Sequence, residues 1–116
     1  MTGSGVLCLF LAGQFDDRSA LKGVKTLEAF DFTHLSGEIR WPYYTCYHCS
    51  QAASLAGGEA RERVLRGIAT YLLGRQRNDG SWPPSGNADY AGECYATSMA
   101  ILSLTPSYQI LPIYQQ

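Results

Sequence analysis

Residues 66–82 read R-G-I-A-T-Y-L-L-G-R-Q-R-N-D-G-S-W, and this stretch decides the fold class. Its apolar residues recur at helical spacing, and Gln76 falls in the last expected turn before a Gly-Ser-Trp turn that ends at Trp82. Gly67 lies in the middle of the predicted helix, where glycine costs about 1 kcal/mol relative to alanine. A helix keeps such a glycine when a neighbour packs against its backbone, so the stretch predicts close packing of helices.

Five helical segments are predicted, separated by polar residues, glycines or prolines. Their ranges are 4–14, 17–30, 43–55, 59–77 and 93–104. The first, third and fifth are almost free of charge, so we expect them to be buried on most or all sides, whereas the second and fourth are amphipathic. This alternation predicts an all-α arc of inner and outer helices, about five in number, in which each outer helix keeps one solvated face.

Two imperfect repeats of about 45 to 50 residues accompany this alternation. Lys22-Gly23 and Arg66-Gly67 are 44 residues apart, each in an amphipathic segment. The segment that begins at Tyr44 is likewise followed, 51 residues later, by one that begins at Tyr95. Helix pairs that repeat in this way stack side by side into arrays.

The composition restricts the classes of partner. With 116 residues the chain forms one small domain, and its charged fraction of 16% implies that much of its surface is apolar or covered. A net charge of −1 argues against a nucleic-acid partner. The apolar run 6–12 is too short to cross a bilayer and has no basic residue before it, unlike a signal peptide, so we expect no transmembrane segment and favour the cytoplasm.

The motif of residues 66–82 resembles the prenyltransferase/squalene oxidase repeat of the terpene cyclase/mutase family, known as the QW motif. Residues 5–17 resemble the G-V-L-x-L-x-L-x-G-x-x-D-D stretch of bacterial members, and 110–115, I-L-P-I-Y-Q, resemble a common C-terminal ending. The resemblance implies a partial α/α toroid, with residues 1–116 as a C-terminal, squalene-hopene cyclase-like segment. It also implies that the motif's Gln and Trp stack between neighbouring repeats and hydrogen-bond to helix ends. The structural repeat residues would be Arg66, Gly67, Tyr71, Gln76, Gly80 and Trp82.

Two features depart from that family. The first repeat has no Gln and Gly-x-Trp of its own, and a complete toroid has about ten to twelve helices rather than five. Five helices would leave inner surfaces uncovered. We therefore expect either another protein chain or the missing part of the toroid as a partner, or self-association.

The resemblance also implies chemistry that the residues do not supply. A cyclase of this family needs an acid cluster of the D-x-D-D type, but Asp16-Asp17 is the nearest match, and we expect Asp16 to cap a helix instead. A protein prenyltransferase needs a zinc site with an Asp-x-Cys, which does not occur here. Among the weak metal candidates, the cysteines are better interpreted as packing residues and the histidine as a hydrogen-bonded core or rim residue, and we expect no cofactor. These candidates are Cys46, His48, Cys49 and Cys94.

Four tyrosines form the most informative candidate surface, because they lie on or near the uncharged segments. They are Tyr43, Tyr44, Tyr47 and Tyr95. If they line the inside of the arc, their ring faces would bind an isoprenoid. The alternative is that they fill the core and hydrogen-bond through their hydroxyl groups.

Three functions are therefore carried forward from the sequence. The first is a module that is not catalytic alone and presents an apolar concave surface for binding. The second is a fragment of a terpenoid cyclase or prenyltransferase that acts on isoprenoids, so enzymatic activity stays open. The third is a decayed gene product without a function.

Overall fold

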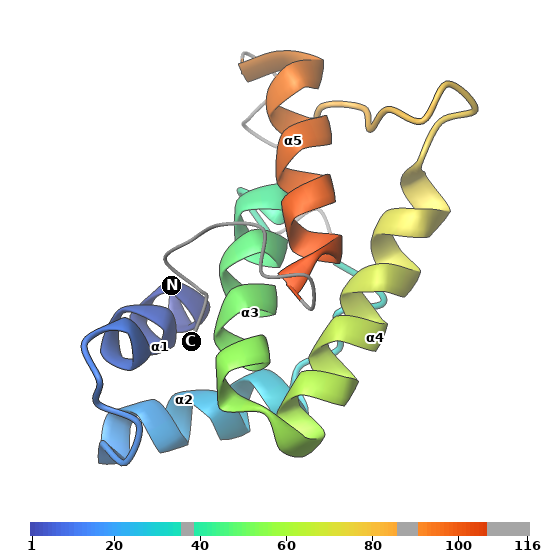
Figure 1. The fold of residues 1–116 in the computed structure, drawn as a ribbon. Coiled ribbons are helices and arrows are strands. Elements are labelled where there is room, and N and C mark those ends of the chain that lie inside the picture. Colours follow the sequence, from blue (N-terminus) through green and yellow to red (C-terminus); the bar gives the residue numbers. More distant parts are fainter. Residues whose placement is uncertain (36–38, 86–90, 107–116) are drawn as a thin grey trace.

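The computed structural model describes residues 1–35, 39–85 and 91–106 (Figure 1). These residues form five helices and no strand, which confirms the all-α prediction. The helices are α1 (Thr2–Leu11), α2 (Arg18–Ala29), α3 (Pro42–Ala56), α4 (Gly58–Arg75) and α5 (Gly92–Leu104). None of the five combines the length and apolarity that crossing a bilayer requires. The ending at 110–115 lies outside the described residues.

The helix ends are set by capping hydrogen bonds, which the spacing of apolar residues does not predict. Helix α1 stops three residues earlier than predicted because Gly13, at φ 78°, donates its N–H to the Phe10 carbonyl, and Gln14 donates to that of Leu9. This pair of bonds is a Schellman motif, which needs the left-handed conformation that glycine adopts readily. The cap of α2 is Asp17 and not Asp16, since the Asp17 carboxylate accepts from Ser19 N at 2.7 Å.

The helices form two layers around a shared core. Helix α3 lies at the centre and packs against α1, α5 and α4, so α1, α3 and α5 form an inner layer (Figure 1). Helices α2 and α4 contact each other and cover the other side of α1 and α3. This is the arrangement of an all-α arc with alternating inner and outer helices.

The mid-helix glycines of the two basic-Gly pairs are sites of close approach. A Cβ atom on Gly23 would lie 2.3 Å from Val6 Cγ2, and one on Gly67 would lie 3.0 Å from Phe32 Cβ. Each outer helix therefore touches the neighbouring segment with its bare backbone. The cost of glycine in a helix is balanced by this contact.

The expectation that the first and fifth helices are buried on most or all sides is wrong. Leu11 on α1 is 41% exposed and Ile101 on α5 is 46% exposed, and the thiols Cys8 and Cys94 are exposed beside them. The reason is position, because α1 and α5 are the two edges of the inner layer and pack against α3 on one side only. An uncharged sequence predicts an inner helix but does not reveal whether both of its flanks have neighbours.

Substitution of Gly23 by alanine tests the close approach. We expect Gly23→Ala to lower the free energy of unfolding by about 1–3 kcal/mol, because the added methyl group overlaps Val6 in a packed core. In the control Gly5→Ala, on α1, the new methyl group meets no atom within 4 Å, so helix propensity should raise stability by up to about 1 kcal/mol. Urea unfolding followed by circular dichroism measures both, and equal effects of the two substitutions would contradict the packing argument.

Candidate functional site

The turn after α4 is held by its own polar groups. Gly80 has a φ of 89°, which favours glycine, and its N–H donates to the Arg77 carbonyl at 2.9 Å. Asp79 Oδ1 accepts from Ser81 N at 3.0 Å and from Ser81 Oγ at 2.6 Å, and these bonds lower the pKa of Asp79. Gln76 Nε2 donates to the Gly80 carbonyl at 3.0 Å, which closes the turn from the helix side.

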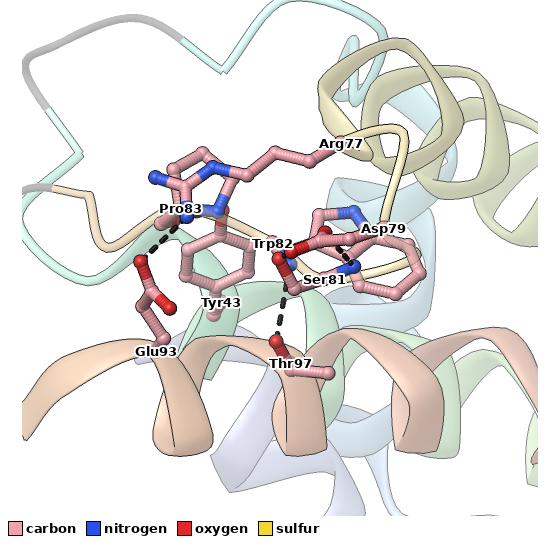
Figure 2. Close-up of polar contacts among 8 residues, drawn as sticks. All are labelled: Tyr43, Arg77, Asp79, Ser81, Trp82, Pro83, Glu93 and Thr97. Atoms are coloured by element: carbon pink, nitrogen blue, oxygen red, sulfur yellow. Dashed lines mark hydrogen bonds and ion pairs between the residues drawn. The ribbon is translucent and has the colours of Figure 1, made fainter.

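Trp82 follows this turn into the interior and bonds to two helices, α4 and α5; Figure 2 shows its contact with Thr97 of α5. Its side chain is 2% exposed, and its indole Nε1 donates to the Leu72 carbonyl at 2.7 Å. Because α4 ends at Arg75, the Leu72 carbonyl is one of the four that lack a partner within the helix. The backbone N–H of Trp82 donates to Thr97 Oγ1 on α5 at 3.0 Å. Trp82 therefore closes the end of α4 and attaches it to α5.

Two further contacts fix the segment on either side of Trp82 (Figure 2). Tyr43 Oη, from the first turn of α3, donates to the Pro83 carbonyl at 2.5 Å, and its ring is 1% exposed. Arg77 Nη1 pairs with Glu93 Oε1 of α5 at 2.5 Å. This pair is solvated and contributes little, whereas the contact from Tyr43 is largely shielded. The segment 76–85 thus connects α3, α4 and α5.

The remaining motif residues divide into packing and surface positions. Gly67 touches Phe32, as described above, and Tyr71 is 9% exposed beneath the Arg75 guanidinium, 5.4 Å from the ring centroid. Arg66 is exposed. The implied stacking of Gln and Trp between neighbouring repeats stays a prediction, because the part of the chain that the structure describes holds one such turn, in which Gln76 bonds to Gly80.

Of the four predicted tyrosines, two share a pocket. Tyr44 and Tyr95 line an open pocket of about 440 Å³ together with Met1, Trp41 and Ala91. Met1, Trp41 and Ala91 are the N-cap residues of α1, α3 and α5, so the pocket lies where the three inner helices begin. These three positions were not predicted from the sequence, although a Trp directly before the Pro that opens a helix is a usable signal. Residues of this kind form a mainly apolar, aromatic wall.

The other two tyrosines have different surroundings. Tyr43 is buried and faces Pro83, as described above. Tyr47 lies edge-on to the His48 ring, with centroids 5.0 Å apart, and the Tyr44 ring is tilted against the same ring with centroids 4.2 Å apart. His48 Nδ1 is buried without a hydrogen-bond partner among the described residues. Burial lowers the pKa of His48, so the imidazole is neutral at pH 7.

The thiols proposed as weak metal candidates are in unlike environments. Cys46 and Cys49 are buried, and burial raises their pKa values to about 12 and about 11, so both stay protonated. Cys94, in contrast, is exposed on α5. Across residues 1–35, 39–85 and 91–106, no three His, Cys, Asp or Glu side chains come together as metal ligands. Cys49 instead packs closely on Gly3 of α1, where a Cβ atom would lie 2.5 Å from its sulfur.

Substitutions of Trp82 and Gln76 compare how much each side chain contributes to the stability of the turn. We expect Trp82→Phe to cost about 1–3 kcal/mol of unfolding free energy, because it leaves the Leu72 carbonyl buried without a donor. Gln76→Ala removes a solvated bond and should cost about 0.5 kcal/mol or less. Urea unfolding of both variants gives the comparison, and a larger loss for Gln76→Ala would refute the assignment of Trp82 as the main clamp.

The neutral His48 predicts a pH dependence of stability. Its folded-state pKa lies below the ordinary value of 6.5, so the unfolded chain binds the proton more tightly. The contribution of neutral His48 to the free energy of unfolding should therefore be fully present above about pH 6.5. It should decrease as the pH falls through 6.5 toward the lowered pKa. Urea midpoints between pH 8 and pH 5 measure this decline, and His48→Gln should reduce it. An unchanged pH profile in His48→Gln would show that another group is responsible.

Known proteins add no constraint to this geometry. No protein-family model, curated protein or solved structure matches the chain. The resemblance to the prenyltransferase and squalene cyclase repeats therefore depends on the motifs themselves.

Proposed function

We propose that this chain is a segment of a prenyltransferase/squalene cyclase-like repeat protein that binds an apolar, isoprenoid ligand. The observation that carries the proposal is the pocket formed by Trp41, Tyr44 and Tyr95 at the start of the inner helices. The two-layer arrangement of α1 to α5 and the Trp82 clamp support the assignment to such a repeat. The isoprenoid class comes from the resemblance of residues 66–82.

The pocket has the properties that a small apolar ligand needs. Its volume of about 440 Å³ lies in the range of small-molecule sites, roughly 300–1,000 Å³. Tyr44 is 41% exposed, so part of its ring is available for contact without unfolding of the core. Aromatic faces bind unsaturated hydrocarbon chains through dispersion and removal of apolar area from water.

Binding is a better interpretation than catalysis by this segment alone. The pocket lining consists of Met1, Trp41, Tyr44, Ala91 and Tyr95, which include no carboxylic acid and no imidazole. Asp17, one of the paired acids in the sequence, is engaged as the cap of α2. In the alternative function, a terpenoid cyclase or prenyltransferase fragment, the catalytic groups would come from another chain or from the rest of a toroid.

A partner for the inner layer belongs to the same proposal. Leu11 and Ile101 are exposed at its two edges, where a further helix would remove apolar surface from water. In a toroid these edges are covered by neighbouring repeats. The proposed partner is therefore either the missing part of such a toroid or another protein chain.

Titration with farnesol tests the proposed ligand class. Trp41 lines the pocket, so binding should change its fluorescence in a saturable way, and Trp41→Phe should remove that signal. Tyr95→Ala should weaken binding by about tenfold or more, since it removes one aromatic wall. The control is Ile101→Ala, on the same helix but outside the pocket, which should bind as the wild type does. A signal that does not saturate, or an equal loss in Ile101→Ala, would contradict the proposed site.

A further inference from the structure

A groove runs along the outer helix α4, away from the residues of the aromatic pocket. Two adjoining hollows of about 360 and 440 Å³ form it, and both are lined by Thr33 and Thr70. One wall is a stripe of α4 residues that recur at three- or four-residue spacing, from Arg63 to Gly74. The other wall is the end of α2 and the segment that follows it, drawn in cyan beside α4 in Figure 1.

The α4 wall is cationic although the protein is not. The whole chain has a net charge of −1, whereas α4 has four arginines against two glutamates. Arg63, Arg66 and Arg75 line the groove. The Arg66 carbonyl accepts from Thr70 Oγ1 at 2.9 Å, but its guanidinium forms no hydrogen bond or ion pair with the described residues. Arg63 Nη1 lies 3.4 Å from Glu59 Oε1, between two exposed side chains. A pair of that kind is weak enough to be exchanged for another carboxylate.

The opposite wall offers apolar surface and acids of its own. Phe30 is 46% exposed and its ring lies edge-on to that of Phe32 at 4.8 Å, so it presents a fixed apolar face at the groove. Asp31 accepts hydrogen bonds from the backbone and side chain of Thr33, which lower its pKa, so its carboxylate stays ionised and adds negative charge to this wall. Glu28 is the other acid on this wall. Positive charge is therefore concentrated on the α4 side.

The dimensions fit an extended polypeptide. The α4 wall spans the thirteen residues from Arg63 to Arg75, whose twelve steps of 1.5 Å give about 18 Å. A strand rises about 3.3 Å per residue, so roughly five or six residues would fill the groove. Alternate side chains of an extended segment point to opposite sides, which would place every second one against the arginines.

We propose that this groove docks an extended acidic segment of another protein, with carboxylates toward the arginines of α4 and an apolar side chain on Phe30. Complementary charge selects the sign of the partner. The exposed ring supplies contact area that a purely ionic surface lacks. The inference is independent of the isoprenoid pocket, because the two sites share no residue.

Fluorescence anisotropy with a labelled hexapeptide of alternating Glu and Leu tests this groove. We expect saturable binding that weakens with salt, and much weaker binding of the matching Lys-Leu hexapeptide. Arg66→Glu should weaken binding of the Glu-Leu peptide by about tenfold or more. The matched control is Lys22→Glu, an exposed residue of α2 outside the groove with the same change of charge, and it should leave binding nearly unchanged.

A further variant distinguishes specific binding in this groove from nonspecific electrostatic binding of the peptide. A Phe30→Ser variant should also weaken binding, because the apolar contact is lost while all charges stay in place. Equal binding of the Lys-Leu peptide, equal loss in Lys22→Glu, or no saturable binding of the Glu-Leu peptide would overturn the proposal. Farnesol binding in Arg66→Glu should match the wild type, so failure of one site is distinguishable from failure of the other.

Discussion

The indole N–H of Trp82 donates to the Leu72 carbonyl at 2.7 Å inside the protein, and the position of the segment 76–85 depends on this bond. An unpaired carbonyl at a buried helix end would be costly, so the turn has to return a donor to the helix that it leaves. The conformation of Gly80 makes that return short. With Trp82 in this position, its backbone N–H donates to Thr97 of α5, and the carbonyl of the next residue, Pro83, accepts from Tyr43 of α3. One side chain thus sets the relation of three helices.

Charge is divided between the two layers for a physical reason. Across α1, α3 and α5, Glu93 is the one Asp, Glu, Lys or Arg side chain, while α2 and α4 hold ten between them. An inner helix is surrounded by other helices, where an unpaired charge would be costly. The outer helices keep a solvated face, and small contacts such as Gly67 against Phe32 let them lie close to the core. The two layers therefore offer different chemistry, aromatic on one side and charged on the other.

The sequence predicted the helices well because hydrophobic periodicity and composition are local properties. It placed five helices and their alternation, but it missed the end of α1, where Gly13 makes a Schellman motif, and it assigned the cap of α2 to Asp16 instead of Asp17. It also overestimated the burial of α1 and α5. Burial depends on the number of neighbouring helices, and no pattern within one helix specifies that number.

The candidate site was harder to predict for a geometric reason. Tyr43 and Tyr44 are successive in α3, so their side chains point about 100° apart and face different surroundings. Tyr47 follows them by about one turn, so it meets a different part of the structure although it lies near their side of the helix. Tyr43 reaches Pro83, Tyr47 touches His48 and Tyr44 lines the pocket. The remaining walls come from residues at the starts of two other helices. A pocket assembled from three helix starts is specified by the packing of the inner layer, and that packing depends on the turn that Trp82 anchors.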